Sequence, residues 1–280
     1  MTIATEIRRP IGTMIVYGGP GRALDAELEI ARKLGAEVLE ILPDWAIEPD
    51  PSALRVRVVD RGFKIHSAHG CWGIRRIRAR RVDLGNLDPE VRSESVDDLR
   101  RCVDWLGAAG GSCLVVHPGG LSDPEDAAAR RDSLARGLIE LADHAVGTGV
   151  TLCVENMPPG VFPGTRMAEL FDLVEEINRP EVALTLDTGH AQIASTPASE
   201  TMAAGHRLAT THVHDNDGRR DVHLPPGLGS VDWGSWIESL NAIRYGGPIV
   251  LECIRHLREF PESMNEALLC LLRRLSGVDR

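Results

Sequence analysis

Short apolar segments alternate with longer amphipathic segments along the whole chain. The apolar segments are residues 12–17, 36–42, 63–67, 112–117, 150–155, 182–187, 210–214 and 248–252. The helix-like stretches include residues 25–34, 89–108, 124–146, 167–177, 233–243 and 261–275. Several of these begin with a helix start signal such as Asp88–Pro89–Glu90, because Asp caps a helix and Pro fits its first turn. The pattern predicts a repeated strand–helix unit.

Eight strand-then-helix units in 280 residues predict an α/β protein with a single (β/α)8 TIM barrel. No linker interrupts the pattern, so residues 1–280 are expected to form one barrel domain. A doubly wound open sheet is the alternative, but the chain lacks the phosphate-binding GxGxxG motif of many such sheets. The helix after residues 63–67 is poorly marked, and residues 71–87 are expected to form a long loop.

Alternation within each strand separates two rows of side chains, because successive residues point to opposite faces. In residues 150–155 the large aliphatic side chains of Leu152 and Val154 share one face, and Glu155 ends the other row. The inner rows of the other strands end in the same way, at His117, Asp187, His212 and Glu252. In a barrel these row ends lie at the catalytic mouth, so the side chains are predicted to converge.

Carboxylates and imidazoles that converge would repel one another or lack partners unless a divalent metal ion joins them. The predicted ligand set is rich in oxygen, which favours Mn²⁺, Co²⁺ or Mg²⁺ at one site; its members are Glu155, Asp187, His212 and Glu252. Further candidate ligands, which favour Zn²⁺ and a multinuclear site, are His66, His117, His190, Asp221 and His223. We prefer His66 to His69 here, and His214 is expected to face away from His212. The number of metal ions stays open between one and three.

Six short motifs, "VHPGG", "VEN", "LDTGH", "THVHDND", "DVHLPPGLG" and "IVLE", occur in this order over nearly the whole chain. Together they resemble the xylose isomerase-like TIM-barrel superfamily, which contains sugar isomerases and epimerases and the endonuclease IV enzymes. The isomerase branch implies one metal ion held by the four-residue set above. It also implies that Glu155 and Glu252 exchange protons with the substrate and that His190 binds a sugar oxygen. The endonuclease IV branch implies three zinc ions, with the five further candidates as additional ligands.

The chain differs from the endonuclease branch after the second strand, where the acidic segment "LPDWAIEPDP" (42–51) replaces an Arg- and Gln-bearing loop. The formal net charge of −10 also disfavours nucleic acid, whose binding depends on neutralising phosphates. We therefore expect a sugar or sugar-phosphate isomerase or epimerase that transfers a proton through an enediolate. The expected substrate-binding residues are His66, His117, His190 and Arg219, with Arg220 as the alternative to Arg219. An endonuclease IV-like hydrolase and a non-catalytic metal- or sugar-binding barrel are the alternatives.

Location and assembly are less strongly constrained by the sequence. The first residues, "MTIATEIRRP", lack the apolar region of a signal peptide, and no apolar run approaches the roughly 20 residues of a membrane span. The six cysteines show no CxxC spacing and are expected to be reduced thiols. We expect a cytoplasmic protein with no membrane partner, and homo-oligomerisation stays open.

Overall fold

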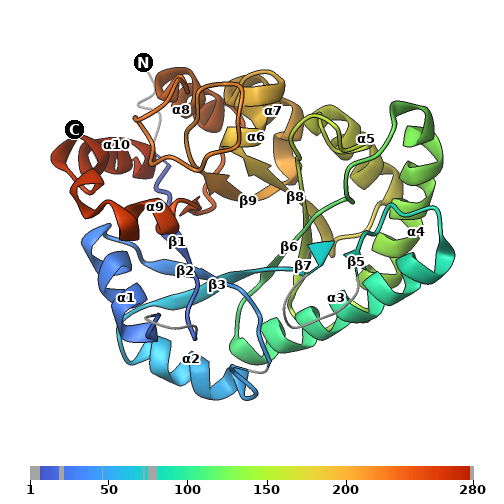
Figure 1. The fold of residues 1–280 in the computed structure, drawn as a ribbon, viewed down its shortest axis with the longest axis horizontal. Helices are drawn as coiled ribbons and strands as arrows, with labels where there is room; N and C mark the ends of the chain where they lie inside the picture. Colours follow the sequence, from blue (N-terminus) through green and yellow to red (C-terminus); the bar gives the residue numbers. More distant parts are fainter. Residues whose placement is uncertain (1–6, 19–21, 46, 72, 75–80, 278–280) are drawn as a thin grey trace.

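The computed structural model describes residues 7–18, 22–45, 47–71, 73–74 and 81–277. Eight parallel strands form a closed barrel in which β10 pairs with β1 (Figure 1). The strands are β1 (Ile11–Ile15), β2 (Val38–Ile41), β3 (Lys64–His69), β6 (Cys113–Val116), β7 (Thr151–Glu155), β8 (Val182–Asp187), β9 (Leu208–Val213) and β10 (Ile249–Leu251). The predicted (β/α)8 barrel is confirmed, and the closed sheet excludes the doubly wound alternative.

The helices form a ring around the barrel (Figure 1). They are α1 (Leu24–Lys33), α2 (Pro51–Val59), α3 (Pro89–Ala109), α4 (Ala127–Ala145), α5 (Met167–Ile177), α6 (Thr188–Ala194), α7 (Pro197–Ala204), α8 (Trp233–Ala242), α9 (Ile254–Glu259) and α10 (Glu266–Ser276). Helix α5 has the predicted bounds. Helices α2, α6, α7 and α9 lie outside the predicted ranges. Each has fewer than ten residues and is therefore too short to show a clear 3.6-residue repeat of hydrophobic positions.

The two faces of the barrel strands differ as the alternation predicts. One row of large aliphatic side chains packs in the core between the barrel and the helices, and includes Leu152, Val154, Leu184, Leu186, Ile249 and Leu251. The other row points into the barrel, where Thr185 and Asp187 of β8 are fully buried. Successive side chains of a strand point to opposite faces. The aliphatic residues packed in this core therefore determine which acids and histidines point into the barrel.

The connection from β3 to α3 is long, as expected for residues 71–87. Its described part contains a small antiparallel pair, β4 (Gly73–Ile74) and β5 (Arg81–Val82). Asp83, directly after β5, is buried and accepts a hydrogen bond from Arg130 of α4 at 2.9 Å. Arg130 also donates to the carbonyl of Phe162. This buried ion pair holds the long connection against the neighbouring loop.

Within the described ranges, no helix combines the length and the apolar character that a membrane crossing requires. The six cysteines are free thiols, and all except Cys270 are buried.

Candidate functional site

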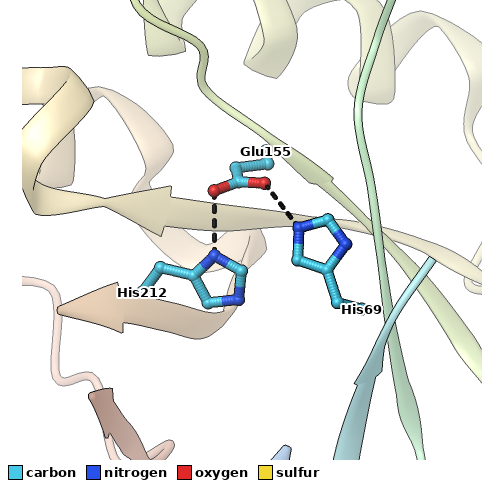
Figure 2. A group of neighbouring side chains, drawn as sticks. All are labelled: His69, Glu155 and His212. Carbon is cyan, nitrogen blue, oxygen red and sulfur yellow. Dashed lines mark hydrogen bonds and ion pairs between the residues drawn. The ribbon is translucent and has the colours of Figure 1, made fainter. Parts of the chain in front are cut away.

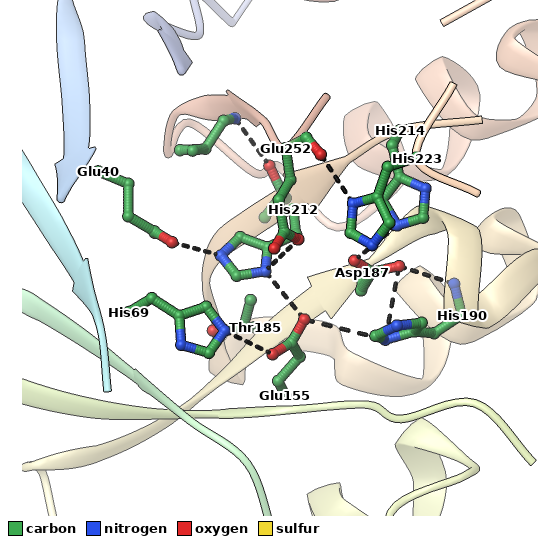
Figure 3. A network of polar contacts seen from close by, with 12 residues as sticks. Glu40, His69, Glu155, Thr185, Asp187, His190, His212, His214, His223 and Glu252 are labelled. Carbon is green, nitrogen blue, oxygen red and sulfur yellow. Dashed lines mark hydrogen bonds and ion pairs between the residues drawn. The ribbon is translucent and has the colours of Figure 1, made fainter. Parts of the chain in front are cut away.

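Four strand ends bring three carboxylates and one imidazole together at the mouth of the barrel. Glu155 and Asp187 end β7 and β8, His212 lies near the end of β9, and Glu252 directly follows β10. The register pairs Asp187 with His212 and His212 with Val250, so these strands reach the mouth at the same height. One ligand atom from each of the four side chains lies within 4.8 Å of the others. The convergence predicted from alternation is present (Figure 3).

Asn156 fixes the end of β8 at this point. Its side-chain oxygen accepts a hydrogen bond from the Asp187 backbone N–H at 2.7 Å, and its amide nitrogen donates to the Asp187 carbonyl at 3.1 Å. This side chain therefore continues the β7–β8 ladder by one residue. The Asp187 carboxylate in turn accepts from the backbone N–H of His190 at 2.7 Å, which caps helix α6. The motifs "VEN" and "LDTGH" thus order each other.

His212 lies at the centre of the four-residue group and is fully buried. Its Nδ1 is 2.9 Å from Glu155 Oε1 and 3.0 Å from Glu252 Oε2. Burial lowers the pKa of His212, but the neighbouring glutamates outweigh this effect and raise the pKa well above its usual value. The same contacts hold the pKa of Glu155 and of Glu252 below the usual range although burial opposes it.

The second carboxylate oxygen of Glu155 faces two further histidines. Glu155 Oε2 is 3.1 Å from His117 Nε2 and 3.7 Å from His69 Nε2. Figure 2 shows Glu155 between His69 and His212, with one oxygen directed at each ring. Burial lowers the pKa of His69, but its contact with Glu155 raises the pKa above the usual value. Glu155 therefore connects the four-residue group with His69 and His117.

The structure places His69, rather than the expected His66, beside Glu155. His66 Nε2 lies 3.2 Å from the hydroxyl of Thr210, two residues before His212 on β9 and so about 7 Å deeper in the barrel. The pairing of β2 with β3 skips His66, because Leu39 pairs with Ile65 and Glu40 with Ser67. Because of this irregularity, and because β3 continues for two residues beyond Ser67, His69 lies at the mouth instead.

A second cluster of polar side chains lies beside the first and shares Asp187 with it. Its members are Asp187, His190, His214, Asp221 and His223, of which His214 and Asp187 are in contact at 3.0 Å. His190 Nε2 and His223 Nε2 each lie 3.3 Å from Asp221 Oδ2. Burial lowers the pKa of His190, but the carboxylates of Asp187 and Asp221 outweigh it and raise the pKa to about 10. His223 behaves in the same way, with a pKa of about 9 caused chiefly by Asp221.

Sequence reasoning missed His214 and Glu40. His214 directly follows β9 and lies two residues after His212, so strand alternation gives both side chains the same direction. The expectation that His214 faces away from His212 is therefore wrong, and its Nε2 lies 3.0 Å from Asp187 Oδ2 (Figure 3). Glu40 lies inside β2 between Leu39 and Ile41, which belong to the outer core. Its inward direction could have been read from the same alternation that identified Glu155. Its Oε1 is 2.8 Å from His212 Nε2.

The loop that carries Asp221 and His223 is organised by one buried carboxylate. Asp215 Oδ1 accepts from the backbone N–H groups of Asn216 and Val231 at 2.9 and 3.1 Å. Asp215 Oδ2 accepts from the Gly227 backbone at 2.9 Å and from the indole of Trp233 at 3.1 Å. Four donors therefore converge on Asp215, and they hold both ends of residues 216–231.

We expect the substitution Asp215→Asn to destabilise the protein by about 1–3 kcal/mol, because its amide NH₂ would face backbone donors and leave buried groups unpaired. Urea unfolding measures this change, and hydrogen exchange should be faster across residues 216–231. Asp217→Asn is the control, since Asp217 is exposed in the same loop and its replacement should leave the free energy of unfolding nearly unchanged. Equal effects of the two substitutions would contradict the organising role of Asp215.

A cavity of about 630 Å³ opens beside Glu252. Its lining residues are Met14, Val16, Leu42, Asp221, Val222, His223, Glu252, Ile254, Arg255, His256 and Glu259. Arg219, expected to bind substrate, is exposed and is not part of this lining; its backbone N–H donates to Asp217. Arg220 is also exposed and pairs with Asp217. Glu252, Asp221 and His223 therefore line this cavity together, and neither Arg219 nor Arg220 lines it.

Known proteins are similar to this chain in sequence and in fold. The chain is 30% identical over 275 residues to L-ribulose 3-epimerase of Methylomonas sp. (strain DH-1). This alignment covers 94% of this chain and 90% of that protein. It is 29% identical over 178 residues to the uncharacterized protein MJ1311 of Methanocaldococcus jannaschii, with 61% of this chain and 60% of that protein covered. A solved structure of a D-tagatose 3-epimerase-like protein superimposes with a TM-score of 0.76 at 21% identity, over 92% of this chain and 98% of that one.

The family model described as xylose isomerase-like TIM barrel matches residues 28–274. This range includes every strand from β2 to β10 and all the residues of both clusters at the barrel mouth. The chain belongs to the xylose isomerase-like TIM barrel family.

Proposed function

We propose that this protein is a divalent-metal-dependent sugar epimerase that inverts a carbon next to a ketose carbonyl. The observation that carries the proposal is the group of Glu155, Asp187, His212 and Glu252, whose ligand atoms lie within 4.8 Å of one another. The sugar epimerase among the relatives, 30% identical over most of the chain, supports the same chemistry. A ketose 3-epimerase activity is the form of the proposal that we test first.

The residues of this group fit a divalent cation. Three carboxylates share the space around a single imidazole, and Glu155 and Asp187 are almost completely buried. Buried carboxylates without enough positive charge are costly, and a divalent ion among them would supply such charge. Three oxygen donors and one nitrogen donor suit Mn²⁺, Co²⁺ or Mg²⁺. A divalent ion held by Glu155, Asp187, His212 and Glu252 would neutralise two of the three negative charges of the group.

Glu155 and Glu252 are the proposed proton-transfer residues. One carboxylate removes the proton from the carbon beside the carbonyl, and the other, protonated, returns a proton to the opposite face. A bound divalent ion supplies Lewis-acid stabilisation to the enediolate oxygens between the two steps. Both glutamates contact the same nitrogen of His212, so their carboxylates lie close together at the mouth. Inversion at one carbon requires that the sugar binds with this carbon within reach of both.

Histidines at the mouth are the proposed ligands of the sugar hydroxyls. His190 and His117 both approach Glu155 and lie beside the four-residue group, so each could donate to an oxygen of the bound sugar. His69 takes the place expected for His66, which lies too deep in the barrel to touch a substrate at the mouth. Arg219 is exposed and is left out of the proposed substrate site.

Conversion of free ketoses by the Mn²⁺-loaded protein tests this proposal. L-Ribulose and a panel of ketohexoses would be incubated with the enzyme, and the products would be separated by chromatography against their 3-epimers. Ketose 5-phosphates in the same panel distinguish a free sugar from a phosphorylated substrate. Formation of a 3-epimer is expected. Saturable sugar binding without any product would instead indicate a non-catalytic binding barrel.

A multinuclear hydrolase is the second candidate, because histidines surround the four-residue group on two sides. His69 and His117 face Glu155, while His190, Asp221 and His223 form a contact group of their own. Together these donors could hold more than one Zn²⁺. Plasma mass spectrometry of protein purified without added metal distinguishes the candidates: about one Mn, Co or Mg per chain supports the epimerase, and about three Zn supports the hydrolase.

A further inference from the structure

Gly189 of α6 lies against the imidazole ring of His214. A Cβ atom built at Gly189 would be 1.9 Å from Cε1, 2.4 Å from Nδ1 and 2.6 Å from Nε2 of that ring. These distances are far shorter than ordinary van der Waals contact. Because the three are similar, the added atom would lie over the face of the ring rather than at its edge. The space that a side chain needs at position 189 is therefore occupied by His214.

Backbone conformation does not explain the glycine at this position. Gly189 lies inside α6 and does not have a positive φ, so any L residue could adopt its conformation. Ala would also favour the helix, because Gly loses more backbone freedom on folding. The reason for glycine is therefore the close approach of the His214 ring.

The His214 ring is held on its other side as well. His214 and His223 are stacked, with ring centroids 4.0 Å apart and an angle of 12° between the ring planes (Figure 3). His223 cannot occupy the space of the Gly189 Cα, so it covers the opposite face of the ring. At the ring edge, Nε2 lies 3.0 Å from Asp187 and 3.6 Å from Asp221. The fully buried ring is thus enclosed on both faces and at one edge.

The backbone of Gly189 is tied to the segment that carries this ring. The Thr188 hydroxyl donates to the His214 carbonyl at 2.7 Å and accepts from the His214 backbone N–H at 3.0 Å. The side-chain amide of Asn216 donates to the Gly189 carbonyl at 2.8 Å. Thr188 and Asn216 are completely buried. A methyl group added at position 189 would therefore press on the ring, since α6 cannot withdraw without breaking buried hydrogen bonds.

We propose that Gly189 is a positioning residue for the ion-binding side chains at the mouth of the barrel. The absence of a side chain at this position lets the His214 ring lie flat against α6, with Nε2 directed at Asp187 and Asp221. Two of the side-chain groups that could hold a metal ion contain His214, and Asp187 also belongs to the four-residue group. Displacement of the ring would therefore disturb metal binding. This inference rests on the proposed function, since Asp187 is a proposed metal ligand.

A single methyl group added at position 189 tests this role. We expect Gly189→Ala to lower the Tm of the metal-free protein by about 5 °C, because an overpacked contact strains both partners. Its Kd for Mn²⁺, measured by electron paramagnetic resonance of the free ion, should rise by a factor of about 10–100, as is typical when the surroundings of metal ligands are altered.

Gly107→Ala is the matched control. Gly107 also lies inside a helix, α3, and the atom nearest to a Cβ at this position would be 3.7 Å away, which is ordinary contact. We expect this variant to lose no Tm and to keep the Kd of the unaltered protein. An equal rise of the Kd in both variants would overturn the specific role of Gly189.

A second background separates the contact with His214 from general crowding. The ring is absent in His214→Ala, so adding Gly189→Ala to this variant should leave its Tm unchanged. If Gly189→Ala alone does not fold, recovery of folding in the double variant supports the same conclusion. An equal loss of Tm in both backgrounds would overturn the proposal, because the methyl group would then clash with something other than the ring.

Metal titration of the unaltered protein distinguishes failure of this inference from failure of the proposed function. If the unaltered protein binds Mn²⁺ and the Kd is the same in Gly189→Ala, the positioning role is overturned and the metal site stands. If the unaltered protein binds no Mn²⁺, both are overturned.

Discussion

Replacing Glu252 by Gln is expected to lower kcat for epimerisation by a factor of about 10²–10⁴, the contribution typical of a positioned acid–base group. Gln has nearly the same shape as Glu but neither accepts nor returns a proton. Glu252 lines the cavity beside the four-residue group. Because the substitution removes a proton-transfer group, the loss should appear in kcat. Glu155→Gln should cause a loss of the same order. Initial rates with each of the two epimers as substrate measure both changes.

The two variants should differ in solvent exchange. Each would retain one of the two carboxylates, and would therefore still exchange the proton of one epimer with solvent while failing to form the other. Glu259→Gln is the matched control, because Glu259 lines the same cavity, pairs with Arg255 and does not belong to the four-residue group. Its kcat should stay within about twofold. Full activity of Glu252→Gln would rule out proton transfer by this residue.

Removing the metal ion by chelation is expected to abolish epimerisation and to lower the Tm. A ligand at 100 times its Kd stabilises the folded state by about 2.7 kcal/mol, which corresponds to about 5–10 °C in a chain of this size. The stabilisation arises because the ion balances buried carboxylates that otherwise repel one another. Calorimetry with EDTA, and again after adding Mn²⁺, measures the shift and its recovery.

Asp187→Asn separates a specific site from loose metal binding. Asn can still cap α6 by accepting from the backbone N–H of His190, as Asp187 does, but it removes one charge of the ligand set. We expect this variant to fold and to lose most of the Tm increase caused by Mn²⁺. Asp217→Asn, at an exposed loop position, should keep the full increase. A metal-dependent Tm shift that survives in Asp187→Asn would place the ion elsewhere.

The part of the site that regular strands supply could be predicted from the sequence. Glu155 and Asp187 end strands in which large aliphatic residues alternate with smaller ones, so the core determines their direction. The same reading applied to β2 would have found Glu40, since it lies between Leu39 and Ile41. The strand signal was therefore sufficient wherever the strand continued without interruption up to the mouth.

The other residues depend on features that alternation does not contain. The pairing of β2 with β3 skips one residue at His66, and this skip decides that His69 rather than His66 reaches Glu155. His214 is the exception, because alternation continued for two residues from His212 gives its observed inward direction. Asp221 and His223 occupy a loop whose shape depends on the four donors gathered by Asp215. These arrangements come from tertiary packing, which no local pattern encodes.

Solvent deuterium incorporation tests the central claim most directly. The Mn²⁺-loaded protein would be incubated in D₂O with the ketose that it converts or, if no conversion is seen, with each ketose of the panel, and the sugar would be examined by ¹H NMR and mass spectrometry. The account predicts one deuterium at the carbon beside the carbonyl in the 3-epimer, no incorporation after treatment with EDTA, and no deuterated 3-epimer with Glu252→Gln. An epimer formed without any deuterium, or no exchange in any ketose by the metal-loaded protein, would contradict proton transfer between Glu155 and Glu252.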